Sequence, residues 1–300
     1  MDKLRPGEYG FLLLTSNLGD PDRKPLTVAQ MRELFARSEQ MKRSEISRDV
    51  DVYDFVSIGY SPKTAQHMID LLHDEVLLQY YLNKARKADC VPITRVSDGY
   101  PLLLRKKLGA EAPGCLWAKG DIALLERPAV ALVGSRALQP ENAAFARKVG
   151  QEAAKQGYVL VSGNAVGADR TAQDACLEAG GSVISVVADR LDEKKAQPNV
   201  LYISEDGYDQ SFSAQRAISR NRVIHCVAQR TFVAQCALGK GGTWDGTVKN
   251  LRNNWSPVFC YRDGSAAMEE LLQMGAVAVD CDELEMFGQL QPDMMNFIDQ

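Results

Sequence analysis

The chain has 300 residues, of which 45% are hydrophobic and 25% are charged, and its formal net charge at neutral pH is −4. This composition supports a sizeable core and excludes an intrinsically disordered chain. No apolar run approaches the roughly 20 residues that a membrane-spanning helix needs, and the first residues lack the features of a signal peptide. We therefore expect a protein of the cytoplasm without a membrane partner.

The cysteine pattern indicates whether the chain binds a metal or forms disulfides. The seven cysteines are scattered without a CxxC pair, so we expect reduced thiols, no metal site and no cofactor.

Residues 264–300 contain eight acidic residues and no Lys or Arg. Because ion binding depends on the local field and not on the net charge, an anion site elsewhere in the chain is compatible with this composition.

Residues 1–90 are predicted to form a small helical module. Apolar residues recur at three and four positions over 26–41 and 61–90, as expected for helices packed on one face. Ser61 and Pro62 predict the start of the second helix as an N-cap and first-turn pair. The same region, IGYSPKTA, is also similar to a helix-hairpin-helix that grips the DNA backbone, although the second glycine of that motif's turn is absent.

The next segment, residues 91–127, is rich in Pro and Gly and is predicted to connect two modules, with a single strand at 115–120. From 128 to 285 the pattern changes to short apolar runs that alternate with helical stretches. The predicted strands are 129–134, 158–163, 182–188, 200–204, 231–236, 257–262 and 276–280, and the predicted helices are 140–156, 168–180, 212–228, 244–254 and 266–274.

Strands that are apolar throughout and alternate with helices are typical of a parallel sheet with both faces covered. We therefore expect an α/β fold with a doubly wound, mostly parallel Rossmann-like sheet over 128–285, preceded by the helical module. The remaining residues, 286–300, are predicted to form an acidic C-terminal tail.

Glycines, hydroxyls and cations gather where predicted strands pass into helices. The stretches are GSR (134–136), SGNAVGAD (162–169), SRNR (219–222) and LGKGGTWDGT (238–247). Glycines let backbone amides approach an anion, hydroxyls donate to it, and Arg and Lys supply charge. Each stretch alone is more often an ordinary turn, and Asp169 alone is more often a first-turn acid of a helix. Together they predict an anion site at the carboxyl edge of the sheet, with Lys240 among its cations.

Three motifs in order, VALVGSR (130–136), VSGNAVGAD (161–169) and SRNRVI (219–224), strongly resemble the DNA-processing protein A (DprA/Smf) family. The resemblance implies a non-catalytic protein that binds single-stranded DNA, forms a homodimer and helps to load a RecA-type recombinase. It also implies that the DNA phosphates lie in a pocket formed by the matching residues, which are Ser135, Arg136, Ser162, Gly163, Gly167, Arg220, Asn221 and Arg222.

The chain departs from this family at three places in the sequence, one of which is FCYRDGS (259–265), where the family has a V-P-G-like strand end. The family's Phe-Pro before its R-N-R is absent, and LGKGGTWDGT replaces an S-G-S-L-I-T-A-like stretch. One alternative is a nucleotide-binding or phosphoribohydrolase-like Rossmann protein, but the catalytic Glu of its G-G-x-G-T-x-x-E loop would fall at Gly246, and Asp245 is one residue early. A second alternative is a partner-binding protein that no longer uses the pocket.

Overall fold

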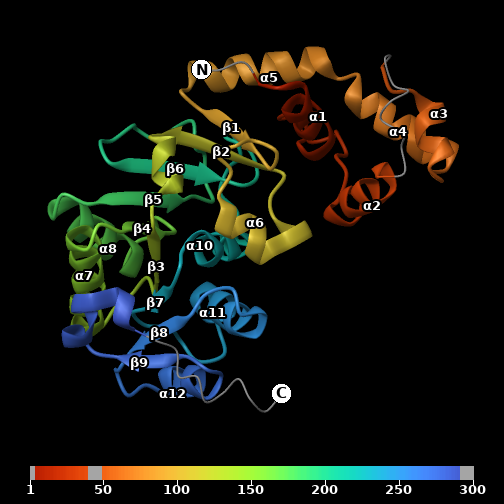
Figure 1. Ribbon diagram of the computed structural model, residues 1–300. Helices are drawn as coiled ribbons and strands as arrows, with labels where there is room; N and C mark the ends of the chain where they lie inside the picture. Colours follow the sequence, from red (N-terminus) through yellow and green to blue (C-terminus); the bar gives the residue numbers. More distant parts are fainter. Residues whose placement is uncertain (1–3, 40–48, 291–300) are drawn as a thin grey trace.

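The computed structural model describes residues 4–39 and 49–290 (Figure 1). Its described residues form one nine-stranded sheet in the order β1-β2-β6-β5-β4-β3-β7-β8-β9. The strands are β1 Val91–Thr94, β2 Cys115–Gly120, β3 Ala129–Val133, β4 Val159–Ser162, β5 Ser182–Val186, β6 Val200–Ser204, β7 Thr231–Val233, β8 Val258–Tyr261 and β9 Val277–Val279. From β6 to β9 all neighbouring strands are parallel, whereas β1 pairs antiparallel with β2, and β2 pairs antiparallel with β6.

Helices cover both faces of this sheet. The α-helices are α1 Pro6–Thr15, α2 Val28–Ser38, α3 Val52–Ser57, α4 Pro62–Leu72, α5 Glu75–Lys87, α6 Leu102–Leu108, α7 Pro140–Lys155, α8 Ala168–Glu178, α9 Ala214–Ser219, α10 Asn221–Val227, α11 Gly242–Asn253 and α12 Ala266–Gln273. Short 3-10 helices occur at η2 Gly109–Glu111, η3 Ile122–Glu126 and η4 Cys281–Gln289. No helix among these described residues is long and apolar enough to cross a bilayer.

Alternate residues of each parallel strand point to opposite faces and build two separate cores. Val130 and Leu132 of β3 pack with residues of α7 and α8 on one face. Ala131 and Val133 pack with α6, α10, α11 and α12 on the other. The expected α/β class, with a doubly wound, mostly parallel sheet and a helical N-terminal module, is confirmed.

Two predicted helices are each divided in the structure. The stretch 61–90 forms α4 and α5, which are separated at His73 and Asp74, and Ser61 caps α4 as expected, accepting a hydrogen bond from the Thr64 N–H. The stretch 212–228 forms α9 and α10, which are separated at Arg220. Periodicity did not reveal these breaks, because the apolar positions continue across both of them.

The segment 91–127 contains more regular structure than predicted. In addition to β2 it forms α6 and the edge strand β1, which contains Pro92. Proline removes one ladder donor and therefore weakens the strand signal, but an edge strand tolerates it. The segment thus joins the modules and also extends the sheet; the division of the chain at 90, 127 and 285 stays a prediction.

An aromatic cluster fixes the helical module against the sheet. Tyr81 of α5 packs edge-on against Trp117 of β2, with ring centroids 5.3 Å apart, and lies 4.6 Å from the ring of Tyr208. The Tyr81 hydroxyl donates to Asp209 at 2.8 Å, and the Tyr208 hydroxyl donates to the Tyr81 carbonyl at 3.0 Å. These bonds satisfy both hydroxyls inside a buried contact.

Residues near the predicted start of the tail pack against the sheet. Phe287 in η4 is fully buried, and its ring centroid lies 4.8 Å from that of Phe232 in β7. Residues 291–300 of the predicted tail lie outside the described residues. Phe287, one residue after the predicted start of the tail at 286, therefore belongs to the core.

Candidate functional site

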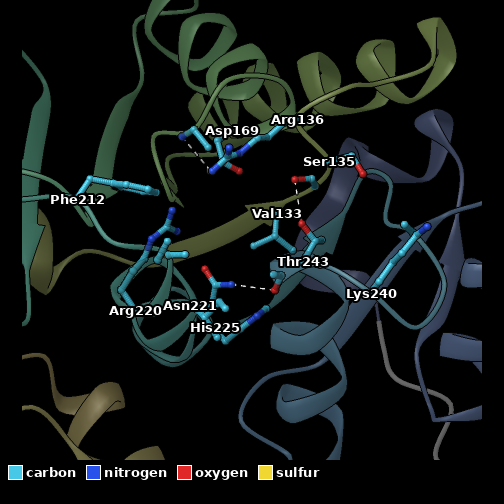
Figure 2. A pocket seen from close by; sticks show the side chains of 18 residues that line it. Val133, Ser135, Arg136, Asp169, Phe212, Arg220, Asn221, His225, Lys240 and Thr243 are labelled. Carbon is cyan, nitrogen blue, oxygen red and sulfur yellow. Dashed lines mark hydrogen bonds between the residues drawn. The ribbon is translucent and has the colours of Figure 1, made fainter.

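The order in which the chain adds strands to the sheet reverses at β3, and this reversal creates the crevice of the site. From β3 the chain adds β4, β5 and β6 on one side and then returns to add β7 on the other. In a doubly wound sheet the crevice outside the carboxyl ends of two such strands is the usual ligand site. Here it holds a cavity of about 410 Å³, lined by the ends of β3, by the loop after β4, by α9 and α10, and by the start of α11 (Figure 2).

Backbone hydrogen bonds join the segment after β3 to the segments after β4 and β7. The Ala168 N–H donates to the Ser135 carbonyl at 3.1 Å, and the Ser135 N–H donates to the Gln235 carbonyl at 2.9 Å. Gly167 has φ +86°, and a Cβ there would lie 2.3 Å from the Arg136 carbonyl oxygen. Gly167 therefore allows close loop packing and does not line the cavity, whereas Ser135 does.

Gly163 lies between an acid and a cation. Its N–H donates to the Asp169 carboxylate at 3.0 Å, and its carbonyl accepts from the Arg220 guanidinium at 2.8 Å. A Cβ on Gly163 would lie 1.8 Å from an Arg220 nitrogen, so a larger residue here would displace the guanidinium from this position. Gly163 lines an adjoining cavity of about 260 Å³, to which Arg136 and Arg220 also contribute.

Asp169 is a structural acid of this loop as well as part of the cavity wall. It is buried in the first turn of α8, and besides Gly163 it accepts from the Ala165 N–H at 3.2 Å. Burial raises the pKa of Asp169, while the positive charge of Arg220 opposes this shift. Asp169 thus lies in the first turn of a helix, as considered from the sequence, and its carboxylate additionally closes the loop after β4.

Arg220 is a buried cation with unused hydrogen-bonding capacity. Only 8% of the residue is exposed, and its Nε has no hydrogen-bond partner among the described residues. Burial lowers the pKa of Arg220, although Asp169 opposes the shift. A buried, unsatisfied N–H is costly, and an anion in the cavity would remove that cost.

Two exposed cations flank this buried one. Arg136 follows β3 and Lys240 lies in the loop before α11, and both line the cavity. Figure 2 shows Arg136 close to Asp169, and Lys240 at the other end of the cavity. Within the described part of the chain neither side chain forms an ion pair.

The first turn of α11 forms another wall. Gly241, Gly242 and Thr243 line the cavity, so the positive end of the α11 dipole faces it. Asn221 lines the cavity and donates to the Gly242 carbonyl at 2.9 Å, whereas the Thr243 hydroxyl donates to the Gly134 carbonyl at 3.0 Å. Thr243 thus holds α11 against β3 and does not have its proton free for a ligand.

Three predicted site residues, Ser162, Gly167 and Arg222, lie elsewhere. Ser162 is completely buried, and its hydroxyl accepts from the Gln173 amide at 2.6 Å. Arg222 forms an ion pair with Glu205 at 2.7 Å and also donates to the Glu111 carbonyl, away from the cavity. The structure therefore brings together Ser135, Arg136, Arg220, Asn221 and Lys240 at the main cavity, places Gly163 at the adjoining one, and leaves Ser162, Gly167 and Arg222 outside both.

Two lining residues were not predicted from the sequence. Phe212 borders both cavities, and His225 lines the main one. His225 is 1% exposed, its Nδ1 lies 3.1 Å from the Thr231 hydroxyl, and burial lowers its pKa to about 3. In the sequence both residues fall inside one predicted helix, where a phenylalanine or a lone histidine is normally interpreted as part of the core.

The loop before α11 does not bring a carboxylate to the cavity. Gly246 packs against Asn221 and His225, and Asp245 does not line the cavity. Asp169, the acid that does, is held by two backbone N–H groups. Nor do three His, Cys, Asp or Glu side chains gather as a metal site anywhere in 4–39 or 49–290. This arrangement gives no support to the phosphoribohydrolase alternative.

Comparison with known proteins identifies relatives of this chain. DNA processing protein DprA of Streptococcus pneumoniae is 32% identical over 182 residues, which is 56% of this chain and 64% of that protein. The crystal structure of DprA from Streptococcus pneumoniae superposes with a TM-score of 0.71 and 25% identity, covering 93% of this chain and 95% of that one.

A second structure shares the fold. It is DNA processing protein A from Helicobacter pylori, described for its single-stranded DNA binding mode, with a TM-score of 0.55 and 24% identity over 65% of this chain and 94% of that one. Residues 92–287 match the family described as DNA recombination-mediator protein A, and this match contains β2 to β9 and every loop of the cavity. The chain therefore belongs to the DNA recombination-mediator protein A family.

Proposed function

We propose that this protein binds single-stranded DNA through phosphates held at the carboxyl edge of β3, β4 and β7. The observation that carries the proposal is Arg220, a buried arginine that lines the cavity with its Nε unpartnered. Arg136, Lys240 and the N-terminus of α11 add positive potential at the same place. A guanidinium and a helix N-terminus are both well suited to a phosphate.

A single strand fits this site better than a duplex. Two adjoining cavities, of about 410 and 260 Å³, share Arg136, Phe212 and Arg220, so a chain of nucleotides could pass from one to the other. Unpaired bases can enter such spaces, whereas the bases of a duplex stay stacked inside the helix. The Helicobacter pylori protein, described with single-stranded DNA, supports the same choice.

The test is a fluorescence-anisotropy titration with a labelled oligo-dT strand and a matched duplex at two salt concentrations. Arg136→Ala should weaken single-strand binding about 10- to 100-fold, because a hydrogen bond to a charged group is worth about 1.5–3 kcal/mol. The slope of log K against log salt should fall by about 0.7 for the lost phosphate contact.

Arg252→Ala is the matched control, because it removes one positive charge from the exposed C-terminal end of α11, far from the cavity. Equal effects of the two variants would show that binding follows net charge and not this site. Displacement of the strand by mononucleotides at similar concentrations would instead favour a nucleotide site.

The assembly and the cellular role complete the proposal. We infer that the protein acts in the cytoplasm as a homodimer and presents the strand to a RecA-type recombinase, as a family of recombination mediators would do. The cysteines are in keeping with a reducing compartment, since all seven lie in the described residues and are free thiols. Light scattering of the protein and strand exchange with a purified recombinase would test these two steps separately.

A further inference from the structure

An exposed apolar rim lies beside the cations of the site. Phe212 is 58% exposed, Val166 67% and Ile218 43%, and the three come from different segments of the chain. Ile218 lines the main cavity, Val166 lines the adjoining one, and Phe212 lines both. Figure 2 shows the Phe212 ring reaching toward the cavity from the side opposite Lys240.

The short loop that carries Phe212 is held in place by one arginine. Arg216 donates to the carbonyls of Gln210 at 2.8 Å and Ser211 at 2.6 Å, and to the Ala188 carbonyl at 2.9 Å. Its Nε also pairs with Asp206 at 3.0 Å. The ring is therefore attached to a loop that is braced before any ligand arrives.

Local packing does not cover the ring. Ser213 is the N-cap of α9, so Phe212 stands at the position whose apolar side chain usually packs against the fourth residue of the helix. That residue here is Ala217, whose methyl group is too small to cover a phenyl ring, and Ala217 itself lines both cavities. A large aromatic face thus stays open at the junction of the two spaces.

We propose that Phe212 stacks against a base of the single strand whose phosphates Arg136 and Arg220 hold, an inference that rests on the proposed function. A cationic groove that follows the backbone together with aromatic faces for the bases is the general way in which proteins hold single strands. The apolar ring accepts the base face, and the adjacent cations match the charge of its phosphates.

The experiment compares two strands of equal length, oligo-dT and an abasic strand that keeps only sugar and phosphate. Phe212→Ala should weaken oligo-dT binding about 5- to 100-fold, since stacking one base on an aromatic is worth about 1–3 kcal/mol. Binding of the abasic strand should change less than twofold, and Phe212→Tyr, which keeps the ring, should bind oligo-dT nearly as the unmodified protein does.

Tyr80→Ala is the matched control, because Tyr80 is also an exposed aromatic, at 62%, but belongs to α5 in the helical module. Equal losses for both strands with Phe212→Ala, or no loss for either while the unmodified protein binds oligo-dT, would overturn the stacking role alone. If the unmodified protein binds neither strand, the proposed function fails and this inference fails with it.

Discussion

Two neighbouring regions of the molecule contain similar numbers of arginines but differ in what those arginines contact. Beside β6, Arg222 pairs with Glu205 at 2.7 Å and Arg216 pairs with Asp206 at 3.0 Å. At the cavity, Arg136 and Arg220 form no ion pair within the described residues. A cation attracts a ligand only where the protein has not already neutralised it.

Within three residues, the motif SRNR contains one arginine with an ion pair and one without an ion pair among the described residues. Arg220 lies at the break between α9 and α10 and donates to Gly163, whereas Arg222, in the first turn of α10, points to Glu205. Two residues along a helix turn the side chain by about 200°, which sends neighbouring cations to opposite sides. The comparison thus distinguishes Arg222, which is paired with a buried carboxylate, from Arg220, which lines the cavity without an ion pair among the described residues.

The largest expected effect is on stability and comes from Arg222→Ala. This change would leave Glu205, whose side chain is 3% exposed, without its cation. Breaking a buried pair in this way costs about 3–5 kcal/mol of the free energy of unfolding. Urea denaturation should show that loss, while the affinity for single-stranded DNA stays within twofold.

Arg190→Ala provides the comparison for this variant, because Arg190 pairs with Asp192 and Glu193 nearer the surface, where a pair is worth about 1 kcal/mol or less. A stable Arg222→Ala protein that no longer binds DNA would reverse the roles of the two regions.

Lowering the pH should change the contributions of the two regions to the free energy of unfolding in opposite directions. Burial lowers the pKa of His225 to about 3, so between pH 6.5 and that value the unfolded chain binds the proton and the folded chain does not. The free energy of unfolding should therefore fall as the pH falls through this window, by about 1.4 kcal/mol per pH unit. Burial raises the pKa of Glu205, so its contribution is present at low pH and is lost as the pH rises past 4.5.

His225→Asn removes the titrating ring and should flatten the dependence of stability on pH between 4 and 6, whatever its effect at neutral pH. Urea denaturation at pH 4, 5, 6 and 7 measures both slopes. Equal slopes for the two proteins would mean that His225 does not stay neutral in the folded state.

The smallest expected effect belongs to Lys240→Ala. Lys240 is exposed at the rim of the cavity, so its attraction for a phosphate is screened by solvent and worth about 0.3–0.6 kcal/mol. Single-strand affinity should fall about two- to threefold, with most of the difference gone at high salt. A loss as large as that of Arg136→Ala would move the centre of the site toward the loop before α11.

The sequence predicted the fold well because each parallel strand is a short apolar run that lies between helical stretches. All seven strands predicted over 128–285 are present, with ends shifted by two to three residues at most. It did not predict the separation of Arg220 from Arg222, because partners such as Gly163 and Glu205 lie far away in the chain. Phe212 was missed for a related reason, since the exposure of an apolar side chain is set by tertiary contacts.

The ends of the nine-stranded sheet limit how copies of this chain can associate. One outer strand, β1, has four residues and includes Pro92, and the other, β9, has three residues. Short outer strands and proline both discourage strand addition from another molecule. A symmetric pair of these chains should therefore join through helices or loops, and the sheet should stay nine strands wide in each copy.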